Sequence, residues 1–262
     1  MKRLFRYLFI LIVLTGFFKQ SVADNTSIDT TNNYEFVKSL KPFLYTRQDS
    51  IRPLLDSVIK VLKVKGNSRA LGYAYLYLGH LYSPDPSHHN EAFTNYNKSL
   101  IVSKALNDNK LYNHVIFGLG VLYANKGNYD SANYYYNKVY RKSLSEHDST
   151  MIPLVLINTA VLQFAKDNYV AAVKMLFEAE PYFIREKNNF RLTLLYDQLA
   201  SSFQKTKRYK SALKYYRLAL RYDSLTNKIN YTPLIIANIG QLYFEQNNMD
   251  SALFYLTQVS QE

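Results

Sequence analysis

The chain of 262 residues contains no cysteine. Disulfide bonds and thiol chemistry are therefore excluded, and so is a lipid-anchored lipoprotein, because acylation would require a cysteine at the cleavage site. The apolar run from Leu8 to Phe18 is eleven residues long, which is too short to cross a bilayer comfortably. These absences leave an exported or intracellular globular chain without covalent crosslinks.

The motifs on which catalysis usually depends are also missing. The sequence has no Gly-rich phosphate-binding loop and no G-x-S-x-G nucleophile turn. Among its five histidines, His88 and His89 are adjacent but have no third metal ligand nearby, and the others have no carboxylate or nucleophile at helical spacing. We therefore predict no enzyme activity, no cofactor and no metal site.

Acidic residues are in short supply, with 20 Asp and Glu against 32 Lys and Arg, a formal charge of +12. The first 23 residues carry four of the cations and no acid, so their removal leaves about +8. A basic chain favours nucleic acid as a partner, but an exported protein meets little of it. We expect acidic proteins, anionic glycans or phospholipid headgroups instead.

Export is predicted by residues 1–23. They begin with Lys2, Arg3 and Arg6, continue with the apolar run, and end in the small-residue sequence Ser21-Val22-Ala23. This pattern is typical of a signal peptide that is cleaved near Ala23, and it predicts a periplasmic or secreted protein. Residues 24–33 are polar and short of core residues, so we interpret them as a disordered spacer.

The rest of the chain repeats with a period of about 40 residues. In each repeat a small residue in one helical segment is followed twelve or thirteen positions later by an alanine in the next. The pairs are Gly79 with Ala92, Gly120 with Ala132, Ala160 with Ala172, Ala200 with Ala212, and Gly240 with Ala252. A fixed period of this size indicates a helical solenoid. Small residues allow two antiparallel helices to approach, and most of the 25 tyrosines are expected to pack around them.

These segments resemble the tetratricopeptide repeat family. The similarity covers about residues 69–262 and is carried by segments such as FGLGVLYANKGNYDSANYYY and LYDQLASSFQKTKRYKSALKYYRLAL, which follow the L-G-x2-Y…A-x3-F pattern. The sequence lacks the family's Trp and closing Pro, and its period exceeds the usual 34 residues. Longer helices or longer connections would both account for the extra residues.

The predicted architecture is an all-α superhelical solenoid of antiparallel helix pairs. A degenerate N-terminal cap at 34–65 precedes five repeats, which we place at about 69–106, 110–143, 150–187, 190–225 and 231–262. Pro181 is expected to bend or end the second helix of the third repeat. The last helix presents Leu253, Leu256 and Val259 without a following helix. Either this end (249–262) forms a homo-oligomer or the chain has lost a continuation.

The resemblance implies that the first helices of successive repeats line a concave groove. Carried over position by position, the groove residues are Leu76, His80, Phe117, Val121, Ile157, Asn158, Asp197, Gln198, Ser201, Asn238 and Gln241. The amides Asn158, Gln198 and Asn238 would form a ladder that hydrogen-bonds an extended peptide. Alternatively, they connect neighbouring repeats to each other.

A second candidate surface is electrostatic. Between 205 and 221 the chain has seven basic residues and no acid, and four of them share one helical face, namely Lys210, Lys214, Arg217 and Arg221. This basic stripe could attract an acidic partner or contact anionic headgroups, or it is an ordinary solvated face. The sequence thus predicts a non-catalytic protein- or peptide-binding scaffold of the cell envelope, with a ligand-sensing module for a small molecule, peptide or glycan as the alternative.

Overall fold

The computed structural model describes residues 30–44, 48–64, 68–226 and 231–259. The predicted signal peptide and residues 24–29 of the predicted spacer lie outside these ranges. α2 begins at Thr30, so the last four residues of the spacer belong to a helix. Within the described ranges the chain forms helices and no strand, which confirms the all-α prediction.

The α-helices follow one another in antiparallel pairs. Their bounds are α2 (Thr30–Ser39), α3 (Gln48–Val64), α4 (Arg69–Tyr82), α5 (His89–Ala105), α6 (Asn109–Asn125), α7 (Tyr129–Ser145), α8 (Met151–Ala165), α9 (Tyr169–Arg185), α10 (Asn189–Lys205), α11 (Tyr209–Asp223), α12 (Thr232–Glu245) and α13 (Met249–Val259). The cap contains α2 and α3, and each expected repeat contains one further pair.

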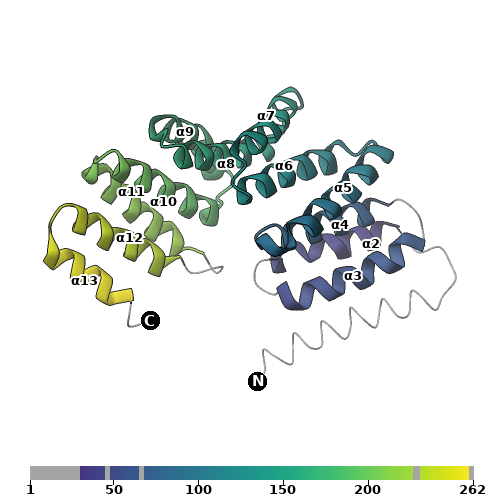
Figure 1. Cartoon of the computed structure of the whole chain (residues 1–262), viewed down its shortest axis with the longest axis horizontal. Coiled ribbons are helices and arrows are strands. Elements are labelled where there is room, and N and C mark those ends of the chain that lie inside the picture. The colour runs from purple at the N-terminus through teal and green to yellow at the C-terminus, as the bar shows by residue number, and fades with distance from the viewer. Residues whose placement is uncertain (1–29, 45–47, 65–67, 227–230, 260–262) are drawn as a thin grey trace, which may run out of the picture.

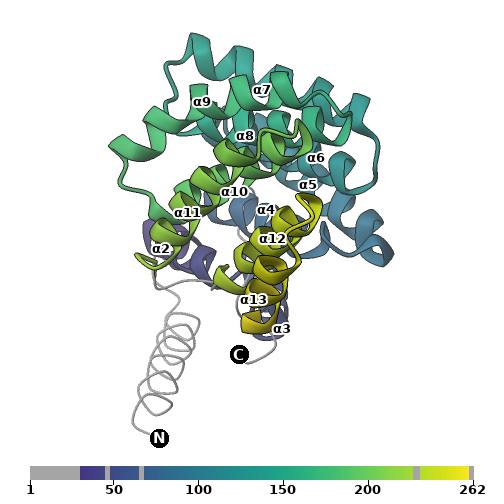
Figure 2. The same ribbon diagram turned by 90° about the vertical axis from the view of Figure 1, so that its left-hand side faces the viewer.

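The pairs stack into an arch. Figure 1 shows α2 and α3 at one end and α12 and α13 at the other, with α8, α10 and α12 on the inner side of α9, α11 and α13. α7 and α9 lie furthest from both ends in two perpendicular views (Figures 1 and 2). The second helix of each pair packs against the first helix of the next, as α5 does against α6. The chain is therefore a helical-repeat solenoid of the predicted type.

Short turns of one design join most of the helices. Between α6 and α7, the backbone N–H of Asn128 donates to the carbonyl oxygen of Tyr123 at 2.9 Å, which is the six-to-one bond of a Schellman motif. The side-chain oxygen of Asn128 then accepts the N–H of Ser131 at 3.0 Å, which caps the start of α7. One residue thus ends a helix and begins the next.

The middle residue of these turns has a left-handed backbone. At Gly127 φ is 72°. The same left-handed conformation, with φ between 50° and 59°, occurs at positions whose distance from Gly127 is a multiple of twenty residues. These are Asn107, His147, Asp167, Lys187, Lys207 and Asn247. The helices α5, α6, α7, α9 and α10 each contain 17 residues. The long period therefore comes from longer helices and not from longer connections, which decides the question that the sequence left open.

The helix does not end at Pro181, as the sequence had allowed: α9 continues through it to Arg185. Proline lacks an N–H and therefore deprives the carbonyl four residues earlier of its partner. Here Pro181 is exposed, so water can solvate that carbonyl on the outer face of the helix.

Small residues and tyrosines determine the spacing within a pair. A Cβ atom added to Gly120 would lie 2.5 Å from Cε1 of Tyr136, and one added to Gly79 would lie 2.5 Å from Cε1 of Tyr96. Both rings are fully buried, so they occupy the space that a side chain on the first helix would need. The prediction that tyrosines near the small residues form core is confirmed at these positions.

The left-handed turns predict an effect on stability. We expect Lys207→Gly to increase the free energy of unfolding by about 0.5–1 kcal/mol, because a non-glycine residue with positive φ is strained. Gly127→Ala is the reciprocal control. It should decrease the free energy of unfolding by a similar amount through φ alone, since an added Cβ there has no neighbour within 4 Å. Urea unfolding followed by circular dichroism measures both, and a destabilised Lys207→Gly protein would contradict the explanation.

Candidate functional site

The predicted groove positions lie on the first helices of the pairs, and the N-terminal part is already covered. Leu76 on α4 is 1% exposed, so its side chain cannot contact a ligand in this structure. The reason is that α2 packs against α4, where the rings of Tyr34 and Tyr73 are 5.2 Å apart. The usable groove therefore begins beyond this point of α4.

His80 is half-buried and engaged within the protein. Its Nδ1 lies 2.9 Å from the hydroxyl of Tyr96, within hydrogen-bonding distance. Burial, with smaller contributions from the nearby His114 and Lys41, lowers the pKa of His80 to about 3. The imidazole is therefore neutral at pH 7 and offers the groove a dipole rather than a charge.

The predicted groove positions on α6 and α8 carry mainly apolar side chains. Phe117 and Val121 on α6 are half-buried, and the Phe117 ring lies 5.6 Å from that of Tyr136. On α8, Ile157 is buried while Val161 is 44% exposed. Val161 occupies the position on α8 that Val121 occupies on α6, and of these apolar side chains it is the one that solvent, and hence a ligand, reaches most easily.

The three amides do not form a free ladder. Asn158 donates from Nδ2 to the carbonyl oxygen of Leu154 in its own helix at 2.8 Å, and its Oδ1 accepts the hydroxyl of Tyr136 at 3.5 Å. Asn238 donates to Asp197 of the preceding repeat, and Gln198 is half-buried. Two of the amides thus connect neighbouring repeats, in line with the alternative interpretation.

Asp197 on α10 places a carboxylate in the groove. Its Oδ1 accepts a hydrogen bond from Nδ2 of Asn238 at 3.0 Å. Burial raises the pKa of Asp197, and the hydrogen bond from Asn238 opposes part of this rise. Among the described residues no cation forms an ion pair with it. Such a carboxylate is suited to a ligand's ammonium or N–H group.

The polar end of the groove is held by a tyrosine from the second helix. The hydroxyl of Tyr216 donates to Oε1 of Gln204 at 2.8 Å and lies 3.2 Å from the hydroxyl of Ser201. Ser201 is half-buried, whereas Gln241 on α12 is exposed. Ser201 is therefore oriented by a buried tyrosine, whereas Gln241 donates to the exposed Glu245 in its own helix.

Two exposed apolar side chains on α12 were not among the predicted groove positions. Leu234 and Phe244 are exposed and add apolar surface to the first helix of the last pair. They stand six positions before and four after Gly240, about one helical turn beyond the positions considered from the family pattern. The same spacing in the third repeat gives Phe164, which is half-buried on α8.

The basic stripe lies away from the groove. All four members, Lys210, Lys214, Arg217 and Arg221, are exposed on α11, which is on the outer side of the arch (Figure 1). Within the described part of the chain none of them forms an ion pair. The stripe and the groove are therefore separate surfaces that can be changed independently.

In the part of the chain that the structure describes, no three or more His, Asp or Glu side chains are grouped so as to hold a metal ion. No helix there combines the length and the apolar character that crossing a membrane requires.

Comparisons with known proteins support the resemblance seen in the sequence. The model of the tetratricopeptide repeat matches residues 194–224 and 235–261, and a search of curated proteins finds no match. Among solved structures, BtubC from P. vanneervenii has a TM-score of 0.70 and 16% identity, covering 82% of this chain and 91% of its own. At this identity the likeness shows the fold alone.

The quorum sensor NprR from B. thuringiensis is similar in two solved forms. Its apo form has a TM-score of 0.68 at 17% identity, covering 95% of this chain and 68% of its own. NprR in complex with its cognate peptide NprX has a TM-score of 0.64 at 17% identity, covering 97% of this chain and 73% of its own. Both structures share the helical-repeat fold with this chain.

The environment of Asp197 predicts an effect of pH on stability. A carboxyl group whose pKa is raised by folding stabilises the protein fully below its unfolded pKa and loses that contribution as the pH rises through the folded pKa. We therefore expect Asp197→Asn to raise the thermal midpoint at pH 7 by roughly 1–3 °C, which corresponds to about 0.5–1 kcal/mol in a chain of this size.

The increase in thermal midpoint caused by Asp197→Asn should shrink as the pH falls and vanish near pH 4, where the carboxyl group of the unfolded chain takes up its proton. Differential scanning calorimetry of both proteins between pH 4 and pH 8 measures the difference. Asp250→Asn, an exposed carboxylate at the start of α13, is the control. A lower midpoint for Asp197→Asn at pH 7 would show that the ionised carboxylate is stabilising where it lies.

Proposed function

We propose that this protein is a non-catalytic scaffold of the cell envelope that binds an extended protein or peptide segment in its groove. The groove is defined here by Val161 on α8, Asp197 on α10, and Leu234 and Phe244 on α12. An extended peptide presents alternating side chains and backbone N–H groups. The apolar side chains of the groove are complementary to the side chains of such a peptide, and the carboxylate is complementary to its N–H groups.

The observation that carries this proposal is Asp197. A half-buried carboxylate costs folding free energy unless a cation or several donors compensate it, and among the described residues Asn238 is the one side chain that donates to it. The matching positions in the two preceding repeats are Ile157 and Phe117, so the fold does not require an acid there. A ligand that donates a hydrogen bond to this carboxylate explains why an acid occupies the position in this repeat.

Two other lines support the proposal. The solved complex of NprR with its cognate peptide NprX shares the fold of this chain, and a protein of that fold can therefore hold a peptide. The basic start, apolar run and small-residue end of residues 1–23 support export, with cleavage near Ala23 and a periplasmic or secreted location.

Peptide binding in the groove is tested by one substitution within it. Peptides would be selected from a displayed random library on the wild-type protein, and their affinities measured by calorimetry. We expect Val161→Arg to lower the affinity of these peptides at least tenfold, about 1.4 kcal/mol, because a long charged side chain replaces an exposed apolar one. Asp197→Asn should lower the affinity of those peptides that carry a cationic group.

The matched control is Lys210→Glu with Arg217→Glu on the outer side of α11, which should leave the fold and the affinities unchanged. If binding instead depends on the control positions and disappears at high salt, the basic stripe is the working surface and its partner is acidic. If the library yields no binder, and Phe117→Ala abolishes binding of a small molecule or glycan without loss of helicity, the protein is a ligand-sensing module.

We also propose that the last helix pair mediates self-association. Leu253 on α13 is 66% exposed, and Leu256 beside it is exposed as well. Multi-angle light scattering over a concentration series should show a monomer–dimer equilibrium that Leu253→Glu abolishes. Leu225→Glu is a matched control, since Leu225 is 60% exposed in the loop after α11. A strict monomer at high concentration would refute this proposal.

A further inference from the structure

A cleft between two second helices lies outside the groove. It has a volume of about 670 Å³, its walls are α3 and α5, and its floor is the face of α4 that carries Tyr75, Leu78 and Tyr82. Leu78 and the groove residue His80 are two positions apart and therefore point to nearly opposite sides of α4. This α3–α5 cleft is thus separated from the groove by the thickness of a helix.

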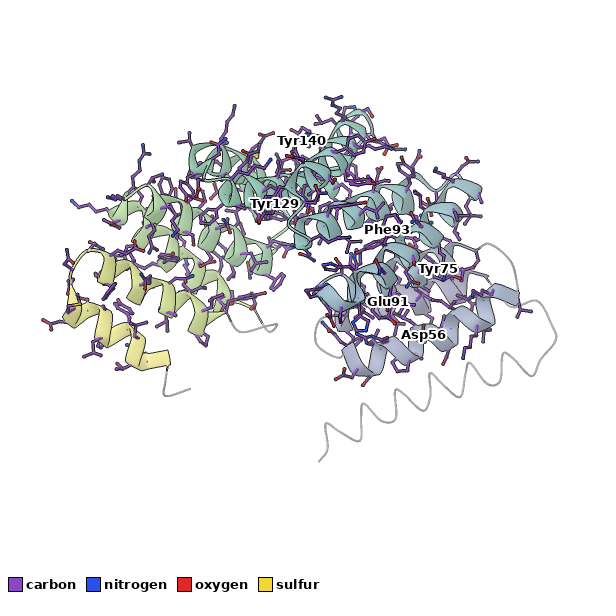
Figure 3. The ribbon with its side chains drawn as sticks, viewed as in Figure 1. Asp56, Tyr75, Glu91, Phe93, Tyr129 and Tyr140 are labelled. Carbon is purple, nitrogen blue, oxygen red and sulfur yellow. The ribbon has the colours of Figure 1, made fainter. Side chains whose placement is uncertain are left out.

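The three helices that form the cleft each contribute a pair of residues seven positions apart. These pairs are Asp56 and Lys63 on α3, Tyr75 and Tyr82 on α4, and Glu91 and Lys98 on α5. Seven residues make two helical turns, so the members of a pair lie on one face about 10 Å apart. Figure 3 shows Asp56, Tyr75 and Glu91 together on the N-terminal half of the arch.

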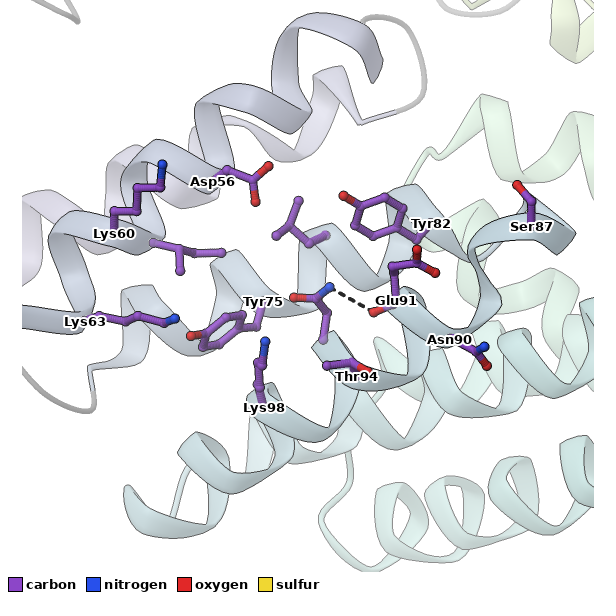
Figure 4. Close-up of a pocket in the computed structure, with 13 residues that line it drawn as sticks. Asp56, Lys60, Lys63, Tyr75, Tyr82, Ser87, Asn90, Glu91, Thr94 and Lys98 are labelled. Atoms are coloured by element: carbon purple, nitrogen blue, oxygen red, sulfur yellow. Dashed lines mark hydrogen bonds between the residues drawn. The ribbon is translucent and has the colours of Figure 1, made fainter.

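The pairs are aligned so that like charges meet. Figure 4 shows Lys63 and Lys98 beside Tyr75 at one end of the cleft, and Asp56 and Glu91 beside Tyr82 at the other. This follows from the topology, because α3 and α5 run parallel to each other and α4 runs antiparallel to both. The cleft therefore has a cationic end and an anionic end, and Lys60 lies between them along α3.

The opposite charges do not neutralise one another. Within the described part of the chain no ion pair joins any lysine of the cationic end to Asp56 or Glu91. Lys98 instead lies 5.6 Å from the centroid of the Tyr75 ring. A separation of about 10 Å is too long for a direct salt bridge, so a bound molecule would have to bridge the two ends.

The walls of the cleft are held in place by neighbouring groups. The Arg52 guanidinium lies 4.7 Å from the centroid of the Tyr82 ring, and His88 stacks on that ring at 5.4 Å. Tyr75 is buried except for a small part of its side chain. On α5, Asn95 donates to the backbone carbonyl of Glu91 at 2.9 Å. Such fixed side chains lower the entropic cost of binding.

We propose that the α3–α5 cleft binds a short zwitterionic ligand of the class of oligopeptides with both termini free. The carboxylate of the ligand lies between Lys63 and Lys98, and its ammonium group lies between Asp56 and Glu91. An extended chain advances about 3.3 Å per residue, so three or four residues match the two-turn spacing. The site goes beyond the groove function, because it uses another face of α4 and another length of ligand.

The test uses the protein purified after expression of the full chain, with trialanine and tetra-alanine as probes. Calorimetry should give a dissociation constant of about 10 μM to 1 mM for the free-ended peptides, as expected for ligands of this size. Acetylation of the amino terminus or amidation of the carboxyl terminus should each weaken binding about tenfold or more, because each removes a charge-assisted hydrogen-bonding group.

Paired variants assign each terminus to one end of the cleft. Lys63→Gln with Lys98→Gln should remove the preference for a free carboxylate and keep the preference for a free amine. Asp56→Asn with Glu91→Gln should do the reverse. All four side chains are exposed, so circular dichroism should report an unchanged fold.

Two controls separate this site from the others. Lys214→Gln with Arg217→Gln removes the same charge from α11 and should not affect alanine peptides. Val161→Arg should not affect them either, so failure of the groove and failure of the cleft give different results. Absence of binding, or binding that neither cap weakens, would overturn the proposal. Binding that depends on the carboxylate and the lysines alone would also overturn it, in favour of a simple anion site.

Discussion

The three-residue Schellman turn is the constraint on which the remaining structure depends. It requires one residue with positive φ and it places a capping side chain directly after that residue, as at Gly127 and Asn128. Helix and turn together then occupy twenty residues, and the two helices of the pair α6 and α7 have the same length of 17 residues. Equal helices keep Gly120 opposite Tyr136 and repeat that contact one period along the chain. Packing thus follows from the turn.

The alternation of first and second helices also explains why this solenoid has two kinds of concave surface. First helices contact first helices of neighbouring pairs only lightly, as α6 does α8, and this leaves their inner faces open as a groove. Second helices are held apart by the first helix between them, and this leaves an opening such as that between α3 and α5. Each opening is lined by residues from consecutive repeats, so its chemistry can change with one repeat while the fold is kept.

Much of the fold could be predicted from the sequence, because the period and the small residues are local patterns. Gly120 and Ala132 mark a helix pair without any knowledge of its partners. The division of the period into helix and turn was harder, although Asp or Asn at 108, 128, 148, 168 and 188 was an available signal. The burial of Leu76 could not be predicted, because it results from α2, whose sequence does not match the repeat. Nor could the cleft, because its charges come from three helices whose alignment only packing determines.

The two proposed sites share a physical feature that folding alone does not explain. In the groove, Asp197 keeps a negative charge where an amide would satisfy Asn238 equally well. In the cleft, Lys63 and Lys98 gather at one end, where each would be better solvated alone. Surface charges contribute little to stability, so like charges that converge on a cavity are best explained by a ligand of the opposite charge. Because the sites face opposite sides of α4 and its successors, both can be occupied at once, and a solenoid with nearest-neighbour contacts lets each bind without distorting the other.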